Sequence, residues 1–138
     1  MKRIISADFV FVVFACSMLW APWSFAQVIL VPQGNALFSV DMAANNHAPK
    51  LAGVCTGPIS SIAIAPGSMI AYAATLELRD NQVCEFDIAK GTVKVIDLPP
   101  RSYPTAIAVN PNGRAVYVVD GQNKSVIPIR VADRASQT

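Results

Sequence analysis

The chain has 138 residues, of which 53% are hydrophobic and 14% charged, and its 11 Lys or Arg against 9 Asp or Glu give a formal net charge of +2 at pH 7. This length allows one domain with a hydrophobic core. The charges do not gather into a run or a basic stripe, so the sequence gives no support to nucleic-acid binding.

Residues 1–26 are predicted to be a secretory signal peptide, which leaves residues 27–138 as the domain. Lys2 and Arg3 form a short positive region, an apolar run follows, and Ser24-Phe25-Ala26 places small residues where a signal peptidase reads them. The apolar run is shorter than the roughly 20 residues of a membrane span, so an uncleaved anchor is the weaker alternative. We therefore expect a periplasmic or secreted protein with no stable membrane span after cleavage.

Short strands joined by tight turns are predicted from residue 28 onward. Residues 28–32 and 37–43 alternate in the manner of strands, and residues 50–54 are a candidate outer strand after a loop. Residues 37–43 align with residues 83–89 of a later unit. The first group therefore starts at the second strand of a repeated unit.

The central unit, residues 59–98, is predicted to contain four strands. Its segment Ile62-Ala63-Ile64-Ala65-Pro66-Gly67 aligns with Ile107-Ala108-Val109-Asn110-Pro111-Asn112 of the next unit, at an offset of about 45 residues. Residues 92–98 alternate cleanly and form the fourth strand, which Pro99-Pro100 closes.

The last unit is the clearer copy. Residues 106–109 alternate small with β-branched side chains, the segment Asn110-Pro111-Asn112-Gly113 specifies a hairpin turn, and residues 115–119 form a β-branched and aromatic strand. A third strand, residues 125–131, contains Pro128. Proline cannot donate to a β-ladder, so this strand favours a position with a free edge.

Antiparallel strands that recur in fours at a period of about 45 residues are typical of β-propeller blades. We therefore predict an all-β fold, a partial β-propeller of about ten antiparallel strands in groups of three, four and three. Propellers close with about four to eight blades, so about two and a half blades leave side faces and strand edges unpaired. Three explanations could account for this incomplete set of blades. The chain is a fragment of a longer gene product, it oligomerises into a closed ring, or it forms a small open β-sheet assembly. The cut inside a blade favours the first.

The last unit resembles the YVTN-type repeat of bacterial seven-bladed propellers through the pattern Pro104…Ile107-Ala108-Val109-Asn110-Pro111-Asn112-Gly113…Val116-Tyr117-Val118-Val119-Asp120…Val126-Ile127-Pro128-Ile129. That group includes surface-layer-like, lactonase-like and quinoprotein amine dehydrogenase β-chain-like proteins. Val119 and Asp120 stand where the repeat prefers Thr and Asn. The resemblance covers about residues 28–132 and implies a propeller fold. It implies no particular chemistry, because such propellers serve as enzymes, electron-transfer partners and adhesive scaffolds.

Cys55 and Cys84 are the two cysteines of the predicted domain, and export would place them where disulfides can form. A bridge between them would close a loop of about 30 residues and stabilise the fold by roughly 3 to 4 kcal/mol through the entropy of the unfolded chain. In the alternative, Cys84 packs as a small apolar residue and Cys55 lies in a link too far away. The sequence leaves both open, and thiol titration of denatured, unreduced protein separates them.

His47 is the only histidine of the chain and is expected at the surface of a loop. Ordinary zinc and copper sites need several His or Cys ligands, and catalytic dyads need a nucleophile beside a base. We therefore predict no catalytic residue, no metal site and no cofactor.

Asp41 and Asp87 recur at the same point of successive units, where two carboxylates could together bind a cation. Arg130 takes the third equivalent position and spoils such a ring. We therefore favour a structural role, in which each aspartate accepts a hydrogen bond from the following turn. Tyr72 and Tyr117 also recur, and we interpret both as packing residues of the core or between sheets.

The sequence thus predicts an exported propeller-repeat protein that is a non-enzymatic binding or interaction module for an unknown protein or small-molecule ligand, with homo-oligomerisation as one way to complete the propeller. The alternative is a fragment of an enzyme-related propeller, resembling lactonases or quinoprotein dehydrogenase β-like chains, whose active residues lie on missing blades. Loops such as residues 110–114 or 121–124 are candidate contact sites.

Overall fold

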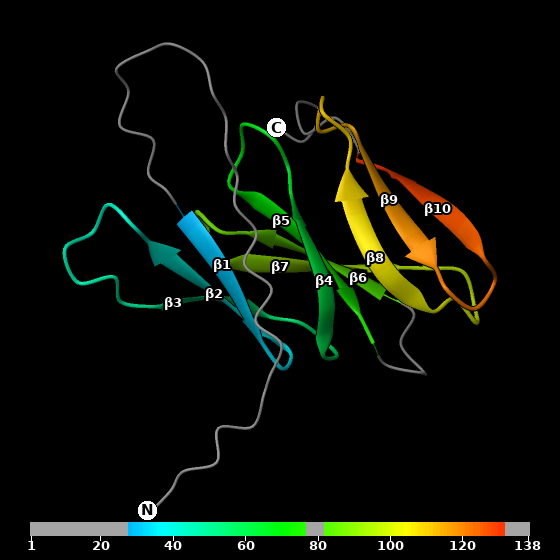
Figure 1. Ribbon diagram of the computed structural model, residues 1–138, viewed down its shortest axis with the longest axis horizontal. Helices are drawn as coiled ribbons and strands as arrows, with labels where there is room; N and C mark the ends of the chain where they lie inside the picture. The colour runs from blue at the N-terminus through cyan, green and yellow to red at the C-terminus, as the bar shows by residue number, and fades with distance from the viewer. Residues whose placement is uncertain (1–27, 77–81, 132–138) are drawn as a thin grey trace, which may run out of the picture.

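A computed structural model describes residues 28–76 and 82–131, in which ten antiparallel strands form three sheets (Figure 1). No helix occurs in these two stretches, so they contain none that is long and apolar enough to cross a membrane. The predicted signal peptide, residues 1–26, lies outside the described residues. The prediction of an all-β fold is confirmed.

The strands fall into groups of three, four and three, as predicted. The first sheet contains β1 (Val28–Gln33), β2 (Ala36–Asp41) and β3 (Lys50–Val54). The middle sheet contains β4 (Ile59–Ile64), β5 (Ile70–Thr75), β6 (Gln82–Asp87) and β7 (Thr92–Asp97). The last sheet contains β8 (Pro104–Val109), β9 (Ala115–Asp120) and β10 (Ser125–Arg130). Within each sheet, strands that are consecutive in the chain are hydrogen-bonded neighbours.

The turn between β8 and β9 shows why the hairpins form where the sequence predicts them. The Oδ1 atom of Asn110 accepts a hydrogen bond from the backbone N–H of Asn112 (3.0 Å), and the N–H of Gly113 donates to the carbonyl oxygen of Asn110 (2.9 Å). Gly113 has a φ of 71°, which residues with a Cβ atom rarely adopt, and Gly67 has a φ of 68° in the turn between β4 and β5. Both hairpins therefore use a glycine with a positive φ in the turn, and in the β8–β9 turn the side chain of Asn110 adds a hydrogen bond.

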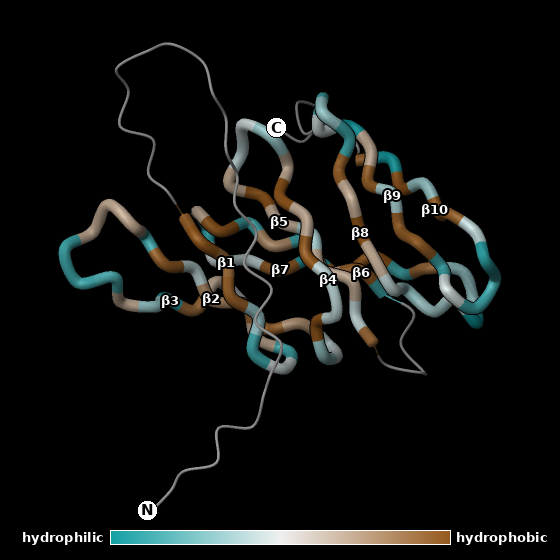
Figure 2. The backbone as a smooth tube through the Cα atoms, viewed as in Figure 1, coloured by the Kyte–Doolittle hydropathy of each residue, from teal (hydrophilic) through white to brown (hydrophobic). Residues whose placement is uncertain are grey.

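The middle sheet packs against both other sheets, and hydrophobic residues concentrate on the strands while hydrophilic residues lie in the turns (Figure 2). The first junction, between the first and middle sheets, buries Leu30, Leu37, Ala52, Cys55, Ile62, Ala71, Ala73, Cys84 and Phe86. The second junction, between the middle and last sheets, buries Ala65, Ile70, Tyr72, Ala74, Val83, Leu98, Ile107, Val116 and Val118. β5 contributes alternate side chains to the two junctions, so all six of its residues are buried.

The two terminal sheets each lack one strand of the middle sheet's pattern among the described residues. The last sheet has the order β10-β9-β8, with no strand equivalent to β7 beside β10. Pro128 lies on this edge strand, as its missing N–H predicted. The first sheet begins with β1 at its other edge, and the described residues contain no strand of this sheet equivalent to β4.

The two recurrent tyrosines differ in their environment, although they occupy equivalent positions in β5 and β9. Tyr72 is 1% exposed in the second junction, as predicted. Tyr117 is 41% exposed, so the prediction that it packs in the core or between sheets is wrong. The physical reason is that Tyr72 is covered by the last sheet, whereas no described sheet covers Tyr117.

Candidate functional site

His47, Asp41 and Asp87, the residues weighed as possible ligands, do not lie together in one site. Residues 28–76 and 82–131 contain no group of three or more His, Cys, Asp or Glu that could hold a metal ion. His47 lies in an exposed loop, where its Nε2 atom is 3.2 Å from the carbonyl oxygen of Met42. Asp41 accepts a hydrogen bond from the N–H of Ala43 (2.8 Å), and Asp87 accepts one from the N–H of Lys90 (3.1 Å). The structural role favoured for these two aspartates is therefore confirmed.

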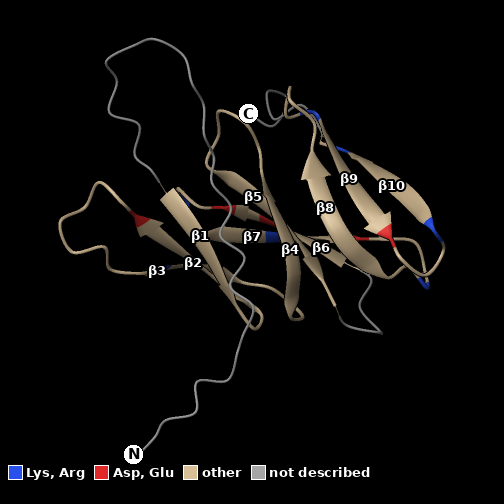
Figure 3. Ribbon diagram, in the orientation of Figure 1, with Lys and Arg blue, Asp and Glu red and all other residues tan. Residues whose placement is uncertain are grey.

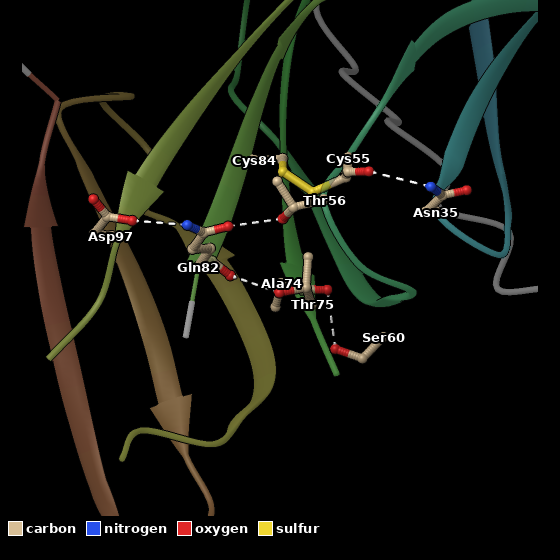
Figure 4. The surroundings of a disulfide bond; sticks show 9 residues. All are labelled: Asn35, Cys55, Thr56, Ser60, Ala74, Thr75, Gln82, Cys84 and Asp97. Carbon is tan, nitrogen blue, oxygen red and sulfur yellow. Dashed lines mark hydrogen bonds between the residues drawn. A yellow bond between two sulfur atoms is a disulfide. The ribbon is translucent and has the colours of Figure 1, made fainter. Parts of the chain in front are cut away.

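Cys55 and Cys84 are brought together at the first junction (Figure 4). Cys55 lies in the link between β3 and β4, Cys84 lies within β6, and a disulfide joins them with a Cα–Cα distance of 6.0 Å. Both side chains are buried among apolar residues, which disfavours attack by an external thiolate. In this arrangement the bridge is a structural tie between the inter-sheet link and the middle sheet.

Polar contacts surround the disulfide and hold the link in place (Figure 4). The backbone N–H of Cys55 donates to the carbonyl oxygen of Asn35 (2.7 Å), and the side-chain amide of Asn35 donates back to the carbonyl oxygen of Cys55 (3.3 Å). Thr56 donates to the Oε1 atom of Gln82 (2.8 Å), whose Nε2 atom donates to Asp97 (2.8 Å). These contacts connect the β1–β2 turn, the link and the edge strand β7.

Asp120, at the end of β9, organises the corner of the last sheet. Its Oδ1 atom accepts hydrogen bonds from the backbone N–H groups of Tyr103 (3.0 Å), Gln122 (3.1 Å) and Asn123 (3.1 Å). Its Oδ2 atom accepts a fourth from the side-chain amide of Asn123 (2.7 Å). Burial raises the pKa of this carboxyl, but the hydrogen bonds to Tyr103, Asn123 and Gln122 outweigh that effect and lower the pKa below its ordinary value of 3.8. Asp120 is therefore a structural carboxylate that the sequence marked only as a departure from the repeat pattern.

Replacing Asp120 with Asn is expected to destabilise the protein more at pH 7 than at pH 3. A carboxyl whose pKa is lowered on folding contributes stability that is present above its unfolded-state pKa, near 3.8, and is lost as pH falls through the folded-state pKa. Asp120→Asn removes that contribution, and its amide group must also face the donor amide of Asn123. Urea unfolding of both proteins between pH 3 and pH 7 measures the gap. A gap that stays constant over this range would contradict the ionic role of Asp120.

The face of the last sheet that points away from the middle sheet is apolar. We call it the outer face, and it consists of two cross-strand rows, Ala106-Val119-Val126 and Ala108-Tyr117-Pro128. All six residues are exposed. The positions in the middle sheet equivalent to Tyr117 and Val126 are Tyr72 and Val83, which are buried in the second junction.

Charged residues are confined to the ends of these strands (Figure 3), and one of them, Arg130, alternates with Val126 and Pro128 onto the edge of the outer face. Asp120 and Arg130 are the only charged residues in β8, β9 and β10, and each is the last residue of its strand. Exposed apolar surface at a position that is otherwise a sheet-to-sheet contact is typical of an interaction site. The outer face is therefore the candidate functional site. Sequence reasoning missed it because the alternation of β9 looks the same whether its second face is covered or exposed.

Comparisons with known proteins agree on the fold. The chain matches no family model and no curated protein. A chain in the crystal structure of the mitotic checkpoint complex is similar to it with a TM-score of 0.61 and 16% identity, over 83% of this chain and 35% of that one. Kuenenia stuttgartiensis hydrazine synthase is similar with a TM-score of 0.53 and 18% identity, over 77% of this chain and 33% of that one.

These likenesses support a β-propeller-like fold and confirm the predicted fold class. The chain spans about a third of the length of each similar structure. At these identities the likeness extends to the fold alone, and the resemblance to the YVTN-type repeat stays a prediction.

Proposed function

We propose that this protein is an exported, propeller-type interaction module that binds a protein partner through the outer face of its last sheet. The observation that carries the proposal is the contrast between equivalent positions of two sheets. Tyr117 and Val126 are 41% and 57% exposed, whereas Tyr72 and Val83 are 1% and 0% exposed. A tyrosine at the centre of an exposed apolar face is the kind of residue that anchors protein interfaces.

A protein partner fits the outer face better than a small molecule. The six residues lie in two rows on three neighbouring strands, which makes a sheet surface rather than a concave pocket.

Export is part of the same proposal. The basic and then apolar sequence of residues 1–26 supports it, and so does the Cys55–Cys84 disulfide, because such bridges persist in oxidising compartments. Cell fractionation and mass spectrometry of the full chain test this part. The expected result is a protein recovered outside the cytoplasm whose first residue is Gln27.

Site-specific photocrosslinking in the exporting cell tests the binding role. A benzoylphenylalanine in place of Tyr117 is expected to form a discrete protein adduct, because it replaces one aromatic ring on the outer face with another. The same group in place of Asn112, in the exposed β8–β9 turn, is the matched control and is expected to form none. Adducts that are absent at position 117, or equally abundant at both positions, would overturn the proposed function.

A further inference from the structure

A second sheet face that no described sheet covers lies at the opposite end of the stack of three sheets. We call it the back face of the first sheet. It consists of the rows Val31-Phe38-Leu51 and Ile29-Val40, whose side chains alternate with the residues buried in the first junction. All five residues are apolar, and Leu51 is 51% exposed. The first sheet thus has one apolar face in the first junction and a second that no described sheet covers.

The two junctions within the chain indicate which sheet face is expected to pack against the outer face. The middle sheet's equivalent of the outer face, around Tyr72, is covered by the face of the last sheet that carries Ile127 and Ile129. Cys84 and Phe86 hold the equivalent positions of the middle sheet and face the first sheet. Each junction within the chain therefore joins the same two kinds of face.

The back face of the first sheet is equivalent to the faces that carry Cys84 and Phe86 in the middle sheet and Ile127 and Ile129 in the last sheet. Aligning Asp41 with Asp87 places Phe38 and Val40 where the middle sheet has Cys84 and Phe86. One chain therefore carries both halves of a third junction, on sheets that lie on opposite sides of the middle sheet (Figure 1). Within the described residues these two halves do not face each other, so a second copy can supply the missing half to each.

We propose that the partner of the outer face is a second copy of this chain, which supplies the back face of its first sheet. This inference rests on the proposed function and names the partner. Two copies joined in this way form two identical junctions about a twofold axis and bring together six sheets. Six lies within the range of about four to eight blades with which propellers close.

Two single-residue variants separate this arrangement from the alternatives. Val126→Lys places a charge on the outer face, and Val40→Lys places one on the back face, at positions whose equivalents in the middle sheet, Val83 and Phe86, are both 0% exposed. A lysine buried without a partner in either junction should raise the dissociation constant of the dimer at least about tenfold. Asn112→Lys, in an exposed turn outside both faces, is the control.

Light scattering of size-separated protein, together with the crosslinking at position 117, gives the readout. We expect a dimer for the unchanged protein and for Asn112→Lys, and monomers for Val126→Lys and Val40→Lys. Each variant alone retains only one intact half of the junction. A mixture of the two variants is therefore expected to form a dimer again through a single intact junction. All four proteins should keep a cooperative melting transition, which excludes misfolding as the cause.

Three other results would overturn the inference, and they differ in whether the proposed function survives. A dimer that survives Val40→Lys but not Val126→Lys means that two outer faces meet each other, and the back face has no role. A monomer whose adduct at position 117 contains another protein leaves the proposed function standing and removes the second copy. A monomer without any adduct at position 117 overturns both.

Discussion

Loss of the Cys55–Cys84 disulfide is expected to lower the free energy of unfolding by about 3 to 4 kcal/mol. The bridge joins residues 29 positions apart, and a cross-link of that span removes roughly this much free energy from the unfolded state through loop closure. For a domain of about 100 residues the change corresponds to a fall in the melting temperature of roughly 15 to 25 °C. The measurement is thermal unfolding of the protein with and without dithiothreitol.

The double variant Cys55→Ala/Cys84→Ala separates the cross-link from the packing of the two sulfur atoms. In the absence of reductant it should melt far below the unchanged protein. After both proteins have been unfolded and refolded in dithiothreitol, they should melt close together, since the unchanged protein has then lost its bridge as well. Thiol titration of denatured, unreduced protein comprising residues 27–138 is expected to find no free sulfhydryl. Two free thiols, together with a melting temperature that is the same with and without dithiothreitol, would contradict the presence of the bridge.

The strands were predictable from the sequence because their signals are local. Alternating β-branched residues mark β9, and the segment around Asn110 and Gly113 carries its turn chemistry within a few positions. The position of Pro128 on an edge strand follows from one missing N–H group. Each of these features needs no knowledge of what lies beyond the hairpin, and the structure confirms each of them.

The candidate site was not predictable because it depends on contacts between sheets. Tyr72 and Tyr117 stand in equivalent positions of two strands, and only the presence of a covering sheet distinguishes them. The distance between Cys55 and Cys84 likewise depends on how the link after β3 crosses the middle sheet, which the sequence left open. Asp120 gathers its four hydrogen bonds from the segment before β8 and the turn after β9, so its role also requires the folded corner.

The two tyrosines allow the role of the covering sheet to be measured directly. Tyr72→Ala is expected to lower the free energy of unfolding by about 3 to 5 kcal/mol, the range for truncating a large buried aromatic side chain, because it opens a cavity in the second junction. Tyr117→Ala removes the same atoms from an equivalent strand position on an exposed face. Under conditions in which the protein is a monomer, its cost should stay below about 1 kcal/mol.

Urea unfolding at high dilution measures the free-energy cost of each variant in the monomer. Repeating the measurement at higher protein concentrations tests the proposed dimer. If a second copy covers the outer face, Tyr117→Ala should become costly as the protein concentration rises, because binding to the folded state adds to its apparent stability. Tyr72→Ala should cost about the same at every concentration, since its covering sheet belongs to the same chain. Equal costs for the two tyrosines at high dilution would mean that the outer face is already covered within one chain, and the site would then have to be sought elsewhere.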